Sequence, residues 1–388
     1  MVKRSDAQPV SEAEELEGLL DKRLTHLHGE SRTVEKLRRV SGGASRQTWA
    51  FRTLDAERRP MDLVLRRDPP SEPRPEEMAR EASALQAARR HGVPGPDLLD
   101  WSADPGDLGA PYLIMTFVPG DTIARRILRD ERYRHARSVL ARDLGRAAAR
   151  IHQVPPAEVP DIPVADVLQD LRRRYASVGI GRPVLEMGFR WLEDHRPPAN
   201  FDTVLVHGDF RLGNVIVDAN GLAAVLDWEL VHLGDPMEDL GYLRIRAWRF
   251  GGTKPVAGVG EYNDLFDAYA EVSGSRPDAE AVYWWQVAGT LSWGVGCLVQ
   301  AQRHFAGASR SVELAAIGRR VAEQEYDILQ MLRGSPRPGR RADAAHLPGR
   351  LRDRHSSAGV PRARRRPLEH CHSTRESRRT CSASSNAS

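Results

Sequence analysis

The pattern of apolar and polar positions over the first 118 residues predicts a small, β-rich lobe. Leucines at helical spacing after a capping Ser11 predict a short amphipathic helix, so residues 1–33 are expected to form a helical extension. From residue 34 to residue 65 the chain changes to short strand-like runs separated by turns, which predicts an antiparallel meander. Residues 34–118 as a whole are predicted to form a mostly β lobe with one embedded helix. The strand-like runs are VEKLRRV, QTWAFRTL, MDLVLRR, PDLLDWSAD and PYLIMTFVPG, and the helical run is EEMAREASALQAARR.

Helical periodicity dominates residues 119–332, with one β-hairpin in the middle. The segment ARDLGRAAARIHQV places Leu144 and Ile151 on one helical face. The runs VLVHG, VIVD and LAAVLD read as strands, and Asn220-Gly221 is a strong signal for a short hairpin turn. Three more helical runs follow, namely EYNDLFDAYAEVSG, AVYWWQVAGTLSWGVGCLVQAQ and SVELAAIGRRVAEQEYDILQML. The expected fold class is α+β, with a small β-rich lobe and a larger helical lobe that carries the hairpin.

The amino-acid composition indicates the cellular compartment in which the protein is expected. The 388 residues are 40% hydrophobic and 28% charged, which is typical of a globular protein in water. The sequence has no run of 18 apolar residues, and its first twenty residues lack the apolar core of a signal peptide. Three cysteines are too few for a disulfide framework or a zinc site. A cytoplasmic location and no membrane partner are therefore expected.

Positive charge is concentrated at the C-terminal end. Residues 333–388 hold 14 Arg, no Lys and 4 acidic residues, so this tail carries +10 while the rest of the chain is near −6. Its Arg-, Pro- and Ser-rich composition cannot bury enough apolar surface to offset chain entropy, which predicts disorder. An anionic partner such as nucleic acid is the functional alternative for the tail. The negative balance elsewhere argues against nucleic acid as a partner, and an incidental extension is favoured.

The polar segment HGDFRLGN interrupts two strand-like runs and is the main candidate for chemistry. Asp209 and Asn214 have the spacing of a kinase catalytic loop, in which Asp orients the acceptor hydroxyl and Asn holds Mg²⁺. Asp227 follows at the end of the hairpin, where it offers a hard oxygen ligand. A turn with a self-capping Asp is the alternative. His207 is expected to order the loop through backbone hydrogen bonds, and Arg211 either neutralises phosphate charge or braces the loop.

The motifs SGGASRQTW, VLRR, HGDFRLGN and LDWELVHLGDPMEDLG together resemble the aminoglycoside phosphotransferase and choline kinase-like family. They are most similar to the branch that is fused to acyl-CoA dehydrogenases in some proteins. The resemblance covers about residues 34–332 and implies a protein-kinase-like fold, ATP and Mg²⁺ as cofactors, and a small-molecule acceptor. No dehydrogenase signature is present, so flavin chemistry is not expected.

This resemblance also implies a role for each matching residue. The SGGAS turn would cover the nucleotide, a helix carboxylate would pair with a strand cation, and the inter-lobe connector would meet the adenine edge. The nucleotide-binding residues would be Gly42, Gly43, Ser45, Arg66, Glu81, Thr116, Phe117 and Val118. Asp209 and Arg211 would be catalytic, and Asn214 and Asp227 would bind the metal.

The sequence departs from the family at the strand cation. Kinases of this kind usually carry Lys there, whereas Arg66 takes the position, with Arg67 as an alternate, and none of the four lysines lies on that strand. Guanidinium binds carboxylate and phosphate bidentately but is not interchangeable with ammonium. The expected function is ATP- and Mg²⁺-dependent phosphate transfer to a hydroxyl of a small molecule. A catalytically weak, ATP-binding pseudokinase or scaffold is the alternative.

The acceptor is less well defined. Asp235 and Asp239 are expected to cap a helix and brace a loop rather than bind a ligand. A stripe of tryptophans is expected to lie mainly in the core, with a place in an acceptor pocket as the alternative. Three acidic residues could form an acidic pocket for an aminoglycoside, but ordinary surface helices carry such residues as well. The stripe is Trp284, Trp285 and Trp293, and the acids are Glu261, Asp264 and Asp267. A hydroxylated metabolite or hydroxyacyl thioester is favoured, and the oligomeric state is left open.

Overall fold

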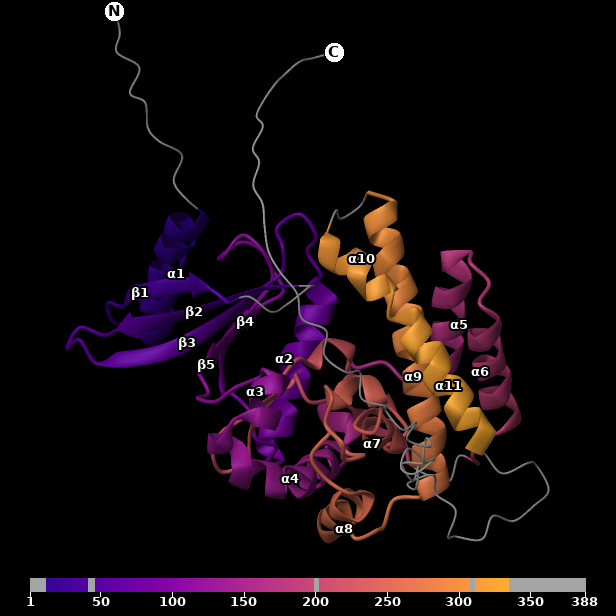
Figure 1. Ribbon diagram of the computed structural model, residues 1–388. Coiled ribbons are helices and arrows are strands. Elements are labelled where there is room, and N and C mark those ends of the chain that lie inside the picture. Colours follow the sequence, from indigo (N-terminus) through magenta and orange to yellow (C-terminus); the bar gives the residue numbers. More distant parts are fainter. Residues whose placement is uncertain (1–11, 41–45, 199–201, 308–310, 335–388) are drawn as a thin grey trace, which may run out of the picture. The chain divides into compact units, whose positions relative to one another are not determined.

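The computed structural model describes residues 12–40, 46–198, 202–307 and 311–334 (Figure 1). The predicted nucleotide-covering residues Gly42, Gly43 and Ser45 lie outside these ranges, as does nearly all of the predicted tail. None of the described helices is long and apolar enough to cross a membrane.

A five-stranded antiparallel sheet forms the small lobe, in the order β1-β2-β3-β5-β4. The strands are β1 Thr33–Arg39, β2 Gln47–Leu54, β3 Pro60–Arg67, β4 Leu98–Ser102 and β5 Tyr112–Thr116. The predicted meander is confirmed for β1, β2 and β3, which are neighbours in chain order, whereas β5 is inserted between β3 and β4. Alternating burial along β3 matches the twofold period of a strand.

Two helices cover opposite faces of this sheet. Leu63 and Leu65 of β3 pack with helix α1 (Glu12–His28), whereas Val64 between them contacts the cluster that contains helix α2 (Pro75–Arg90). Neighbouring strand residues point to opposite faces, so one apolar run supplies both contacts. The helix predicted as an N-terminal extension thus contributes to the core of the small lobe.

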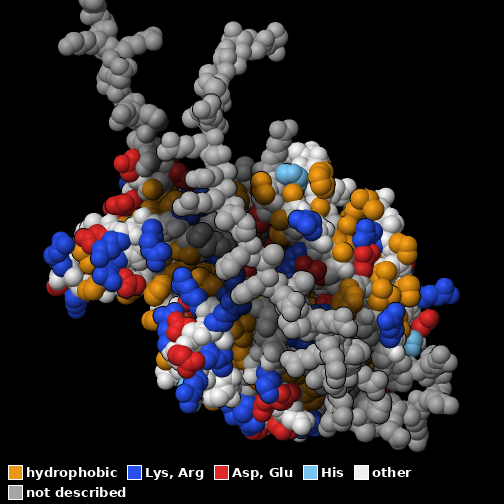
Figure 2. Space-filling view, viewed as in Figure 1, with side chains coloured by type: hydrophobic (Ala, Val, Ile, Leu, Met, Phe, Trp, Pro, Cys, Tyr) orange, Lys and Arg blue, Asp and Glu red, His pale blue; other side chains and the backbone are white. Residues whose placement is uncertain are grey.

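Charged side chains of both signs are interspersed over the exposed strands of the small lobe, at the left of Figure 2. Several are paired within the sheet; Arg52 with Asp62 and Arg59 with Asp55 are examples, each with 2.7 Å between nitrogen and oxygen. Mixed charge of this kind gives the strands a well-solvated surface.

The larger lobe is helical, and the long helix α9 (Ala279–Phe305) contacts most of the later helices. Its partners are α5 Val167–Val178, α6 Pro183–Asp194, α7 Met237–Tyr242, α10 Val312–Gly318 and α11 Val321–Gly334. Helix α4 (Arg134–His152) packs instead on α8 (Tyr262–Ser273), and α3 (Ala124–Arg129) precedes α4. The last predicted helical run is divided into α10 and α11, and a Cβ at Gly318, the last residue of α10, would lie 2.6 Å from the Cβ of Ala301 in α9.

Two small antiparallel ladders stand among these helices. The predicted hairpin is present as β7 (Val215–Val217) and β8 (Leu222–Val225). The preceding run, β6 (Val204–Val206), does not join this hairpin as expected and pairs instead with β9 (His232–Gly234). The loop between β6 and β7 causes this separation: Gly208 has φ +80°, and a Cβ there would lie 2.4 Å from the carbonyl oxygen of Leu230. Glycine therefore permits the turn that redirects the chain.

The contact between α4 and α8 depends on Gly145. A Cβ at this position would lie 2.4 Å from the carbonyl oxygen of Leu265, which belongs to the backbone of α8 and cannot move easily. Gly18 in α1 is the matched opposite case, because it is exposed and a Cβ there would meet nothing within 4 Å.

We predict that Gly145→Ala lowers the free energy of unfolding by about 1–3 kcal/mol because the added methyl group forces α4 and α8 apart. Gly18→Ala should instead raise it by about 0.5–1 kcal/mol, because it removes the backbone entropy cost of glycine in a helix. Urea unfolding followed by circular dichroism measures both values. Equal effects of the two substitutions would contradict the close approach at Gly145.

Candidate functional site

A buried carboxylate on α7 holds the loop between β6 and β7 in place. The two oxygens of Asp239 accept hydrogen bonds from the backbone N–H groups of His207 and Gly208, at 2.9 and 3.0 Å. His152 lies 3.1 Å from the same carboxylate. Burial raises the pKa of Asp239, but the hydrogen bond and charge of His152 outweigh this effect and the pKa is lowered. Asp239 is therefore a loop-bracing group, as expected.

His207 joins the two ends of the hairpin region. Its Nε2 lies 3.0 Å from the carbonyl oxygen of Leu226, and its Nδ1 accepts a 3.3 Å hydrogen bond from the backbone N–H of Asp209. Because Nδ1 acts as an acceptor, the ring proton belongs on Nε2, where it is donated to Leu226. The expectation that His207 orders the loop is confirmed by these contacts.

Both oxygens of Asp209 are engaged within its own loop. The Nε of Arg211 donates to Oδ1 at 2.9 Å, and the Nδ2 of Asn214 donates to Oδ2 at 2.5 Å. Burial raises the pKa of Asp209, although the Arg211 charge works in the opposite direction. Arg211 also stacks over the ring of Trp248, 4.4 Å from its centroid. The structure therefore shows Arg211 as a brace for Asp209, and its role toward phosphate stays a prediction.

Asp227 lies just after β8 with a left-handed backbone, φ +70°. This conformation is unusual for a non-glycine residue but is tolerated by Asp. Burial raises the pKa of its carboxyl group, yet the adjacent Arg66 guanidinium outweighs burial and holds the pKa below its usual value. Asp227 is therefore an ionised carboxylate close to Asp209, whose own pKa it helps to raise.

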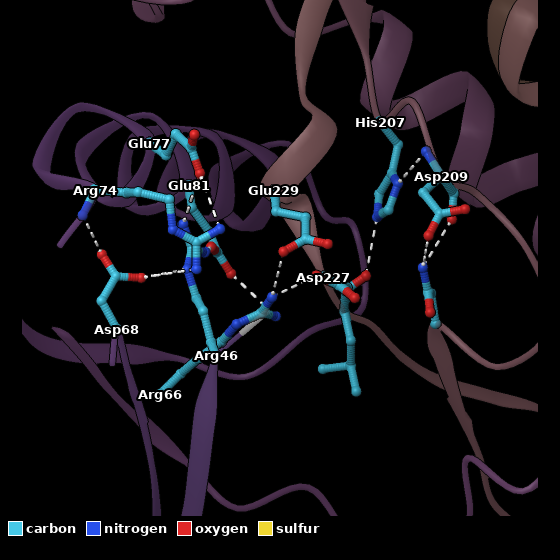
Figure 3. Close-up of polar contacts among 12 residues, drawn as sticks. Arg46, Arg66, Asp68, Arg74, Glu77, Glu81, His207, Asp209, Asp227 and Glu229 are labelled. Atoms are coloured by element: carbon cyan, nitrogen blue, oxygen red, sulfur yellow. Dashed lines mark hydrogen bonds and ion pairs between the residues drawn. The ribbon is translucent and has the colours of Figure 1, made fainter. Parts of the chain in front are cut away.

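Arg66 connects the two lobes (Figure 3). Its guanidinium forms ion pairs with Glu81 of α2 at 3.2 Å, with Asp227 and with Glu229 at 3.4 Å. The alternate cation, Arg67, points to the other face of the strand, where it binds Gln47, Glu12 and the carbonyl oxygen of Leu108. Arg66 is thus the strand residue that lies beside both the helix carboxylate and the hairpin.

The connector after β5 contains the three residues predicted to meet the adenine edge. The N–H groups of Thr116 and Phe117 donate to the carbonyl oxygens of Asp97 and Asp62, each at 3.0 Å. Among the described residues, no acceptor lies within hydrogen-bonding distance of the Val118 N–H. Of the three predicted adenine-binding residues, Val118 is therefore the one with a donor available.

The tryptophan stripe is divided between two environments. Trp284 and Trp285 are core residues, and their Nε1 atoms donate to the carbonyl oxygen of Leu192 and to Asp235. Trp293 is half-buried and lies 4.7 Å from Trp248, the residue on which Arg211 stacks. The preference for core is confirmed for the first two, whereas Trp293 is separated by one ring from Arg211 in the loop between β6 and β7.

A hollow of about 650 Å³ opens near this aromatic pair, between α11 and the 3₁₀ turn Arg246–Arg249. The ring of Phe250, which lines it, lies next to Gly213 of the loop. Asp327 and Glu323 on its wall are paired with Arg246 and Arg320, at 2.8 and 3.2 Å. The wall therefore offers no surplus of negative charge.

The three helix acids that could have favoured an aminoglycoside have other partners. Glu261 and Asp264 form a capping box at the start of α8, and Asp267 is ion-paired with Arg276. Asp235 accepts the backbone N–H of Met237 at 2.8 Å, which caps α7 as expected.

Sequence reasoning missed Arg46. Its side chain is 1% exposed, its Nε donates to Asp68 at 2.9 Å, and it forms an ion pair with Glu81, the same carboxylate that Arg66 contacts. An arginine that directly follows the Gly-rich turn was the available signal. Its significance depends on Asp68 and Glu81, which are 22 and 35 positions away, and the local pattern does not reveal them.

Comparisons with known proteins agree with this geometry. A model of the phosphotransferase enzyme family matches residues 36–275. Streptomycin 3''-kinase of Streptomyces griseus is 30% identical over 239 residues, which cover 56% of this chain and 83% of the kinase. Acyl-CoA dehydrogenase family member 10 of Mus musculus is 30% identical over 218 residues, which cover 52% of this chain but 19% of that protein. The chain thus spans about a fifth of the length of the mouse relative.

The fold is also found in solved structures. The GDP complex of aminoglycoside 2'-phosphotransferase-IIIa has a TM-score of 0.57 at 14% identity, and the match covers 80% of this chain and 97% of that one. The protein-kinase-like α+β fold with a small β-rich lobe and a helical lobe is therefore confirmed. With a family model that matches more than half of its length, this chain belongs to the phosphotransferase enzyme family.

Proposed function

We propose that this protein transfers the γ-phosphate of ATP to a hydroxyl group of a small molecule, with Mg²⁺ as cofactor. The observation that carries the proposal is the meeting of Asp209, Asn214 and Asp227 at the open end of the β7–β8 hairpin, with Arg66 and Glu81 facing them. Phosphoryl transfer requires mainly positioning and charge neutralisation, which such a set provides. The similar solved structure is a GDP complex, which supports a nucleotide as one substrate.

The donor set of the hairpin fits Mg²⁺. Asp227 is ionised, and the Asn214 amide nitrogen donates to Asp209, which leaves the amide oxygen of Asn214 to face a cation. Among the described residues, no group of three or more His, Cys, Asp or Glu side chains could hold a metal by itself. This suits Mg²⁺, which usually combines one or two protein oxygens with phosphate oxygens and water. When bound, it would neutralise charge on the transferring phosphate.

Asp209 is proposed to orient or deprotonate the acceptor hydroxyl. Its raised pKa favours proton uptake, and its contacts with Arg211 and Asn214 fix its direction. Arg66, paired with Glu81, is proposed to bind the α and β phosphates, and the Val118 N–H the adenine edge. Gly42, Gly43 and Ser45 keep their proposed role over the phosphates.

The hollow beside Phe250 is the proposed place of the acceptor. The acidic residues that line the hollow are paired with arginines. The acids of helix α8 serve a capping box and an ion pair, so the described residues offer no acidic wall to a polycationic aminoglycoside. We therefore favour a hydroxylated metabolite or hydroxyacyl thioester. The match to acyl-CoA dehydrogenase family member 10 is in keeping with this choice.

Release of ADP from Mg²⁺·ATP, measured across a panel of acceptors, tests the proposed function. The panel contains alcohols, amino alcohols, aminoglycosides and hydroxyacyl-CoA thioesters. Phosphorylated product with at least one acceptor is expected. Nucleotide binding without transfer to any acceptor would favour the scaffold alternative, which the contact between Arg66 and Asp227 also suits.

We predict that Asp209→Asn retains nucleotide binding while kcat falls by about 10²–10⁴-fold, because the acceptor proton then lacks a base. Asp202→Asn is the matched control, since Asp202 is exposed and lies two residues before the first residue of β6, outside the loop. Steady-state kinetics with any acceptor from the panel provide kcat. An unchanged kcat in Asp209→Asn would contradict the catalytic role.

We also predict that Asp227→Asn removes most of the effect of Mg²⁺ on nucleotide binding. The substitution takes away the charged oxygen ligand, which should weaken Mg²⁺-dependent ATP binding at least about tenfold. Calorimetric titration with ATP, with and without Mg²⁺, measures the difference. Equal enhancement by Mg²⁺ in the variant and the wild type would exclude Asp227 as a metal ligand.

A further inference from the structure

We propose that Arg46 is a positioning residue of the nucleotide site, which holds Glu81 and helix α2 so that Arg66 can leave Asp227 for phosphate. The inference rests on the proposed function, because it assigns the task that Arg46 performs when nucleotide binds. Figure 3 shows the guanidinium of Arg66 between Glu81 and the pair Asp227 and Glu229, whereas Arg46 lies toward Asp68.

Arg46 ties three segments of the small lobe together. It lies directly before β2, its Nε contacts Asp68 just after β3, and it is paired with Glu81 in α2. Asp68 in turn accepts the backbone N–H of Arg74, the residue before α2, at 2.7 Å. The side chains of Arg46, Asp68 and Glu81 are 1%, 0% and 3% exposed. Water therefore cannot replace any partner in this network, and its geometry is fixed by the fold.

Two guanidinium groups share the single carboxylate of Glu81. Arg46 binds Oε2, and Arg66 lies 3.2 Å from Oε1. If Arg66 were the only partner, its departure would leave a buried carboxylate without a counter-charge, which is strongly unfavourable. With Arg46 in place, Glu81 stays paired whether or not Arg66 moves.

Nucleotide and metal binding would favour movement of the Arg66 side chain away from Asp227. It is paired with Asp227, the proposed ligand of Mg²⁺, and with Glu229 across the cleft. If Asp227 held a cation, its carboxylate would no longer be available to Arg66, and phosphate oxygens would offer the guanidinium a bidentate partner. Repulsion between the two arginines also favours movement of Arg66 away from Arg46. Burial is the largest cause that lowers the pKa of Arg46, and the nearby charge of Arg66 is the second. Arg46 thus takes the helix-anchoring part of the task and leaves Arg66 the phosphate-binding part.

The test compares Arg46→Met with Arg67→Met in the full chain. Both substitutions remove a largely buried arginine, and the two arginines lie at neighbouring ends of β2 and β3. Arg67 is bound to Gln47, Glu12 and the Leu108 carbonyl rather than to Glu81. The readouts are the Kd of Mg²⁺·AMP-PNP, the thermal unfolding temperature, and amide hydrogen exchange over residues 75–90.

Arg46→Met should weaken Mg²⁺·AMP-PNP binding about tenfold and speed exchange in α2, because one charge-assisted contact to Glu81 is lost. Arg67→Met should lower the unfolding temperature while the Kd stays within about twofold of wild type. Arg46→Lys keeps the charge and can reach one of the two carboxylates, so it should restore part of the affinity. It also serves if the Met variant does not fold.

A second comparison tests the sharing of Glu81. Glu81→Gln should weaken nucleotide binding more in the wild-type protein than in the Arg46→Lys variant. In that variant the contact between residue 46 and Glu81 is already weaker, so less is lost when the carboxylate is removed. Equal Kd values for the Arg46 and Arg67 variants, or unchanged exchange in α2, would overturn the assignment of Arg46. Failure of the wild-type protein itself to bind Mg²⁺·AMP-PNP would instead refute the proposed function, so the two failures are distinguishable.

Discussion

The ion pair between Arg66 and Asp227 is the contact on which the organisation of the site depends. It joins a strand of the small lobe to the end of the hairpin in the helical lobe, and Glu81 supports it from α2. Opposite charges facing each other across a cleft attract one another strongly only where water is partly excluded, and Arg66 is 14% exposed. The same arrangement creates a place for a ligand that carries both signs, such as a phosphate group with its metal cation.

The other half of the site is held by a buried carboxylate rather than by the ligand. Asp239 fixes the backbone at His207 and Gly208, and His207 then fixes Asp209 and the strand end at Leu226. Because these bonds are formed within the protein, the loop geometry is set before any substrate arrives. Preorganisation of this kind is how an enzyme avoids the cost of ordering its groups during the reaction. The mobile element of the proposed mechanism is therefore the Arg66 side chain and not the loop.

The sequence predicted the parts of this structure that are encoded locally. The strands of the small lobe, the β7–β8 hairpin and the grouping of Asp209 with Asn214 follow from period, turn residues and spacing. The pairing of β6 with β9 and the role of Arg46 do not, because each depends on a partner distant in sequence. The break between α10 and α11 was also missed, since a single glycine such as Gly318 is tolerated in a helical pattern and does not by itself mark a boundary.

The arginine at the strand position is best understood together with the second arginine. A lysine ammonium is a single point charge, whereas a guanidinium can place separate N–H groups toward Glu81 and Asp227 at the same time, as Arg66 does. The same reach pairs Arg66 with Asp227, the proposed metal ligand. If Arg66 were the only cation beside Glu81, its movement toward a phosphate would leave Glu81 without a counter-charge. The buried pair of Arg46 with Glu81 removes this penalty. The presence of arginine where lysine was expected is thus balanced by the pair of Arg46 with Glu81, and the two arginines are expected to act as one unit.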